Sequence, residues 1–184
     1  MTKILLLAVL ATLLQPPAAQ PDSAPNKESK ERFVYNFLLF VHWPADAFQS
    51  PSEAVRVQII GRDPLAVSLG RFLADKSVDN RRIVVTHADA PTGAPFPHVL
   101  FVSAGEGPQL AKVLDAYCRA PVLTVSDVDR FANRGGVIGL IEEDHVLHFS
   151  INQTAASEAR LQVSAQLFHL AVPLFSAISP CSSR

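Results

Sequence analysis

Hydrophobic residues recur along the chain with two different spacings. In some segments they recur every three or four positions, as in helices, and in others they alternate with polar residues or form short runs, as in strands. Apolar residues before Pro44 recur every three or four positions, which predicts a helix that ends near this proline. The segment VRVQIIG alternates and is rich in β-branched residues, so it predicts a strand. We expect the next segment, RDPLAVSLGRFLADK, to be a helix with Asp63 as its cap and Pro64 in its first turn.

The alternation of strand and helix patterns continues through the middle of the chain. RRIVVTH, HVLFVS and PVLTVSD predict strands, and GPQLAKVLDAYCR predicts a helix. Strands that alternate with helices favour a mostly parallel sheet with helices packed on its faces. The short apolar runs within these strands are typical of strands that are buried on both sides.

The stretch RFANRGGVIGLIEED holds three glycines, two of them directly after an arginine, a composition that also occurs in phosphate-binding loops. A dinucleotide-binding loop must follow a strand and open a helix, whereas this stretch leads into the strand pattern VIGLIEE. The alternating segment VLHFSIN follows, so the pair predicts a β-hairpin whose entry bend is Gly135-Gly136. A phosphate site is the disfavoured alternative.

A long helix is expected after the hairpin. Asn152 is placed to cap the segment QTAASEARLQVSAQLFHLAVPLF, and its apolar residues form a broad stripe. Such a stripe lies across a sheet or against a partner chain. The predicted fold class is therefore a single-domain α/β sandwich, with a mostly parallel sheet, helices on its faces, and a C-terminal β-hairpin followed by a long helix.

The N-terminus differs in composition from the rest of the chain. Lys3 precedes a largely apolar run from Ile4 to Leu14, which is too short to span a bilayer and typical of a signal peptide. Cleavage after Ala18-Ala19 would leave a soluble periplasmic protein; an uncleaved anchor or a buried helix is the alternative. The expected division is a signal peptide at 1–19, a disordered leader at 20–30, the α/β domain at 31–176 and a polar tail at 177–184.

Charge and cysteine content narrow the possible partners. Sixteen Lys and Arg residues balance seventeen Asp and Glu residues without clustering, which argues against nucleic acid as a partner. The only cysteines are Cys118 and Cys181, too few for a structural zinc site. An oxidising compartment favours a disulfide between them, whereas the Ser/Pro-containing tail around Cys181 favours two free thiols, so both states stay open.

The sequence offers no catalytic residues, metal ligands or cofactor site that we would assign. His145 and His148 lie three positions apart in a strand pattern and point to opposite faces, so they do not chelate a metal together. Ser103 in FVSAGEG lacks the glycine that precedes the serine of a nucleophile elbow, and no base accompanies it.

Polar residues follow the predicted parallel strands at one edge of the sheet, where open α/β sheets bind ligands. The candidates for binding a small carboxylate or phosphate there are Arg62, Asp63, Ser103, Glu106, Ser126 and Asp127. Arg62 would be the counter-charge. The alternative is that Asp63, Ser103 and Ser126 are ordinary helix caps and turn formers.

Several blocks, in order, resemble the YfiR-like proteins over about residues 31–172. They are FVYNFLLFVHWP, IIGRDPL, VLFVSAGE and the long block from VLTVSD to LFHLA. The resemblance implies a non-enzymatic periplasmic regulator with an α/β sandwich that tends to dimerise. Such regulators bind and repress a membrane-bound diguanylate cyclase or act with a sensor kinase, which lowers cyclic di-GMP and restrains biofilm formation.

This sequence departs from the family pattern at two points. Known members respond to redox state through several cysteines, whereas this chain has only two. In addition, Arg160 stands where the family pattern usually has glycine. The alternative function is a periplasmic small-molecule sensor or carrier. For the regulator, we expect the partner interface to include Leu174 and Phe175, just past Pro173, because the apolar stripe is wider than one sheet contact requires.

Overall fold

The computed structural model describes residues 29–179 and residue 181. The predicted signal peptide, and the predicted leader up to residue 28, lie outside the described residues. Ser29 caps the first helix, α1 (Lys30–Phe40), because its hydroxyl accepts a hydrogen bond from the Arg32 backbone N–H. The folded chain therefore includes Lys30, which the sequence placed in the leader.

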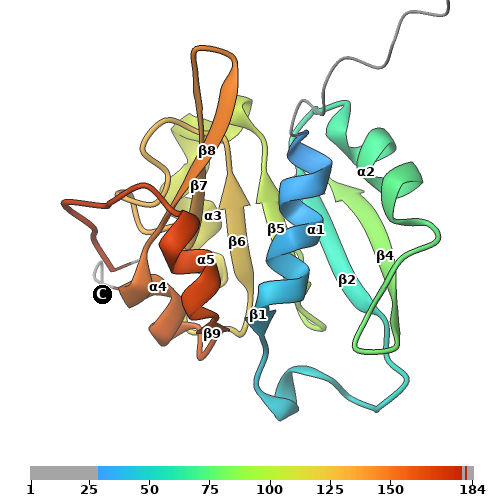
Figure 1. Cartoon of the computed structure of the whole chain (residues 1–184). Coiled ribbons are helices and arrows are strands. Elements are labelled where there is room, and N and C mark those ends of the chain that lie inside the picture. The colour runs from blue at the N-terminus through green and yellow to red at the C-terminus, as the bar shows by residue number, and fades with distance from the viewer. Residues whose placement is uncertain (1–28, 180, 182–184) are drawn as a thin grey trace, which may run out of the picture.

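A seven-stranded sheet forms the centre of the domain (Figure 1), in the order β3-β4-β2-β5-β6-β7-β8. The strands β4, β2, β5, β6 and β7 run parallel, whereas β3 and β8 pair antiparallel at the two edges. The mostly parallel α/β fold predicted from the sequence is confirmed. The strands are β2 (Val55–Ile60), β3 (Ser77–Val78), β4 (Arg81–Ala88), β5 (Val99–Val102), β6 (Leu123–Ser126), β7 (Ile138–Glu143) and β8 (Val146–Ile151).

Helices pack on both faces of this sheet (Figure 1). On one face, α1 and α2 (Leu65–Leu73) share a hydrophobic cluster with Phe101. On the other face, the 3₁₀ helix η2 (Ala104–Gln109) leads into α3 (Leu110–Ala116), which packs on Leu100. All four residues of β5 are buried, as expected for a strand that is covered on both sides.

The predicted hairpin is confirmed. β7 and β8 pair along their whole length, and the two-residue turn Asp144-His145 has positive φ at both positions, as a type I′ turn requires. Gly135 has φ +102°, so it supplies the predicted entry bend. Gly136 is constrained differently, because a Cβ there would lie 1.9 Å from Cε1 of Phe131.

The prediction of a single long helix after the hairpin is wrong, because two short helices separated by a strand stand there. Asn152 caps α4 (Gln153–Glu158) as predicted, but the helix ends near Arg160, whose φ of +56° is left-handed. The chain then forms β9 (Gln162–Val163), which pairs antiparallel with β1 (Val41–His42), before α5 (Ala165–Leu170) begins. Pairing of β9 with the distant strand β1 therefore overrides the local helical pattern. The left-handed backbone at Arg160 also explains why the family pattern usually has glycine at this position.

Candidate functional site

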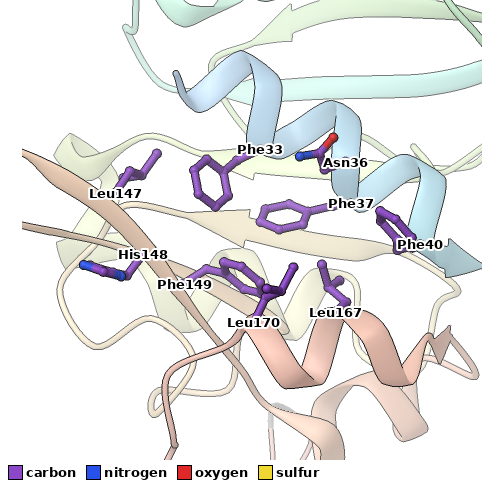
Figure 2. A pocket seen from close by; sticks show the side chains of 9 residues that line it. All are labelled: Phe33, Asn36, Phe37, Phe40, Leu147, His148, Phe149, Leu167 and Leu170. Atoms are coloured by element: carbon purple, nitrogen blue, oxygen red, sulfur yellow. The ribbon is translucent and has the colours of Figure 1, made fainter. Parts of the chain in front are cut away.

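An apolar groove opens between α1, β8 and α5 (Figure 2). Its floor consists of aromatic rings: the centroids of Phe33 and Phe37 lie 5.7 Å and 5.2 Å from that of Phe149. Leu167 closes the floor from α5. The groove encloses about 180 Å³ and its remaining lining residues are Asn36, Phe40, Leu147, His148 and Leu170. Three elements far apart in sequence thus build one apolar recess.

The rim of the groove is exposed and chemically asymmetric. Leu170, at the end of α5, is 72% exposed although it is a large apolar residue. At the hairpin end, Leu147 pairs directly with Glu142, so both side chains lie on the same face of the hairpin. α5 itself contains no acidic residue. The groove is therefore bordered by a carboxylate at its hairpin end, whereas α5 contributes no carboxylate.

The chain after α5 crosses the side of the domain as a strap, residues 171–179 and 181, that is held at both ends. The Val172 N–H donates to the Phe149 carbonyl at 2.8 Å. Farther along, the Ile178 N–H donates to the Asn133 carbonyl at 3.1 Å, and Asn152 Nδ2 donates to the Ile178 carbonyl at 3.0 Å. A disulfide between Cys118 and Cys181, with Cα atoms 5.6 Å apart, fixes the strap to the end of α3.

The strap carries both residues that the sequence analysis selected for a partner interface. Phe175 is 96% exposed, and Leu174 is partly buried. Residues 171–179 contain no charged side chain. An aromatic side chain exposed on a fixed, uncharged segment is accessible to a partner.

The sequence-predicted ligand candidates follow the carboxyl ends of β2, β5 and β6, at one edge of the sheet. Asp63 Oδ1 accepts a hydrogen bond from the Leu65 N–H at 2.8 Å, and Ser126 Oγ accepts one from the Val128 N–H at 2.9 Å. These two residues therefore serve local turns. Arg62 is exposed to solvent.

The remaining candidates surround the point where the chain order of the sheet reverses, between β2 and β5. A Cβ on Gly61 would lie 2.8 Å from Cγ of Glu106, so the Glu106 side chain packs against the Gly61 backbone, directly after β2. Because Val102 pairs with Ser126, the next residues, Ser103 and Asp127, follow side by side. Ser103 Oγ and Asp127 Oδ1 are buried, and neither has a hydrogen-bond partner in the described chain.

Lys30 is the residue at this edge that sequence reasoning missed, because it lay in the predicted leader. Its ammonium contacts Asp127 Oδ2. Partial burial lowers the pKa of Lys30, but the hydrogen bond and charge of Asp127, with smaller contributions from Asp63 and Glu142, raise it above its usual value. Lys30 is thus held charged among carboxylates.

A buried histidine, His98, fixes the chain at the other ends of the parallel strands, directly before β5. His98 is 1% exposed; its Nδ1 accepts from the Arg56 N–H at 3.0 Å, and its Nε2 donates to the Ala47 carbonyl at 3.1 Å. Its ring stacks on Phe48 at 4.2 Å between centroids. Burial, and then the positive charge of Arg56, lower the pKa of His98 to about 4.

The His98 pKa predicts a loss of stability in acid. The unfolded chain takes up a proton near pH 6.5 and the folded chain only near pH 4, so stability is lost as pH falls through this window. The loss attributable to His98 should total about 3 kcal/mol. Urea unfolding between pH 7 and pH 4 measures this loss.

His98→Gln keeps a hydrogen-bond donor and an acceptor, so it should flatten the dependence of stability on pH. The control His145→Gln, at the exposed turn, should not flatten it. Equal slopes in the natural protein and both variants would contradict the assignment to His98.

Over residues 29–179 and 181, no group of three or more His, Cys, Asp or Glu side chains is arranged to hold a metal ion. Within the same residues, no helix is long and apolar enough to cross a membrane.

Comparison with known proteins is consistent with this architecture and with the blocks found in the sequence. No curated protein matches the chain. The protein family described as YfiR/HmsC-like matches residues 27–172, which is most of the 184-residue chain. The match includes α1, the whole sheet, α4 and α5, and therefore all three elements that line the groove. The chain therefore belongs to the YfiR/HmsC-like family.

Proposed function

We propose that this protein is a non-enzymatic periplasmic regulator that represses an inner-membrane signalling enzyme, a diguanylate cyclase, by binding the enzyme's periplasmic sensory part. Repression lowers cyclic di-GMP and restrains biofilm formation. Membership of the YfiR/HmsC-like family supports this function. The observation that carries the binding role is Phe175, which is 96% exposed on a strap fixed at both ends.

Deleting the gene is expected to raise cyclic di-GMP severalfold, because the cyclase loses its repressor. Replacing Leu174 and Phe175 together by aspartate should produce the same rise, since charged side chains cannot be buried in an apolar interface. Cyclic di-GMP measured by mass spectrometry, with the exported protein quantified in parallel, tests both.

Val67→Asp is the matched control for the double variant, because Val67 is 60% exposed but lies on α2, away from the strap. This control should repress normally. If the gene deletion leaves cyclic di-GMP unchanged in every growth condition, the regulator function fails. Normal repression by the Leu174/Phe175 variant would instead place the interface elsewhere.

A small-molecule sensor or carrier is the second candidate, favoured by the unpartnered Ser103 Oγ and Asp127 Oδ1 at the ligand edge. Asp63, Glu106 and Asp127 make this edge acidic, with Lys30 as the ammonium among them. A ligand with hydrogen-bond donors suits it better than the carboxylate or phosphate expected from sequence. Gene neighbourhood discriminates: an adjacent membrane-bound cyclase favours the regulator, and a transporter operon favours the carrier.

A further inference from the structure

The dimensions of the apolar groove suit the side chains of a docked segment. Phe33, Phe37 and Phe40 lie along the groove at positions i, i+4 and i+7 of α1, so the α1 side of the groove extends about 10 Å, or two helical turns. The volume of about 180 Å³ is below the roughly 300–1,000 Å³ of sites that enclose a drug-sized molecule. Side chains at i, i+3 or i+4 and i+7 of a helix would fit such a groove.

The apolar surface of the groove continues toward the strap. Leu170, which lines the groove at the end of α5, is exposed. Beyond Leu170 the uncharged strap carries Phe175. The groove and the strap therefore border one another, and a segment that fills the groove would also contact the surface assigned to the partner.

Charge gives the groove a direction. Glu142 shares a face with Leu147 at the hairpin end, and Glu143 and Asp144 follow it at the exposed turn. Lys30, which Glu142 also influences, is already paired with Asp127. A complementary segment carries a basic residue here and apolar residues along the rest of its length.

We infer that the groove between α1, β8 and α5 receives an amphipathic helix from the periplasmic part of the membrane-bound partner, with a Lys or Arg of that helix next to Glu142. This inference rests on the proposed function and adds the kind of segment that is bound, its place and its direction. The strap then forms one border of the same interface.

Site-specific photocrosslinking in the exporting cells tests the position. A benzophenone side chain replaces Leu170 in one variant and Val67, the exposed α2 residue, in the control. The Leu170 variant should crosslink to a membrane-anchored cyclase at least tenfold more than the control. Peptide mapping should place the crosslink in a periplasmic segment with apolar residues at helical spacing. Crosslinks that join only two copies of this chain, or equal yields from both positions, would overturn the inference.

Charge reversal tests the direction. Glu142→Lys, on the exposed hairpin, should weaken association about tenfold at low salt and less at high salt. Reversing the basic residue in the mapped partner segment should restore association. An unchanged affinity contradicts the orientation. Because gene deletion tests repression separately, a rise in cyclic di-GMP on deletion with normal binding by Leu170→Asp and Glu142→Lys would reject the groove while leaving the regulator function intact.

Discussion

Replacing Cys118 by serine is expected to lower the free energy of unfolding of the oxidised protein by roughly 4 kcal/mol. The disulfide to Cys181 closes a loop with a sequence separation of 63 residues, and opening it frees the unfolded chain to sample many more conformations. The bond also fixes the end of the strap that presents Phe175. Urea unfolding with and without reductant measures the change.

Cys181→Ser and the double serine variant are the matched controls. Both should lose the same amount as Cys118→Ser, because one bond is removed in each case. Reductant should lower the stability of the natural protein to the level of these variants and leave the variants unchanged. A natural protein whose unfolding is indifferent to reductant would contradict the prediction.

Replacing Gly136 by alanine is expected to destabilise the domain by about 3 kcal/mol. The added Cβ would lie 1.9 Å from the ring of Phe131, which is almost fully buried and cannot move outward freely. Valine should cost more, since its branches extend into the same ring. Thermal and urea unfolding of the purified variants measure the loss.

Two further variants distinguish steric overlap from a backbone requirement at Gly136. Gly70→Ala, where an added Cβ has nothing within 4 Å, should not destabilise the helix that carries it. Combined with Gly136→Ala, Phe131→Leu should cost less than the sum of the two single changes, because the smaller side chain makes room. Simple additivity of the two changes would show that Phe131 is not the obstacle.

Local sequence patterns predicted most of the fold because their causes are local. The apolar runs of β5 and β6 indicated strands buried on both faces, and both strands are buried. The same prediction was wrong for Ile83–Val85 in β4, which has no buried residue. The hairpin followed from the alternation on either side of Asp144-His145, whose turn needs only two left-handed residues. Asp63 and Asn152 act on backbone N–H groups two and three residues away, as predicted for caps.

The candidate site could be predicted only in part. The edge that gathers Asp63, Ser103 and Asp127 followed from the rule for parallel strands, because strand ends meet wherever strands are adjacent. Lys30 was missed since the sequence around it looks like a leader. The groove was missed entirely, because its walls come from α1, β8 and α5, and no sequence spacing connects residues so far apart.

The sequence by itself determined the alternation of elements, the mostly parallel sheet, the hairpin and the family, because these depend on residue periods, turn residues and ordered blocks. Tertiary structure alone decided the rest. Pairing of Val163 with Val41 divides the expected long helix, and packing of α5 against α1 and β8 shapes the groove. The physical reason is that backbone hydrogen bonds and apolar contacts between distant segments exceed the small local preference for helix.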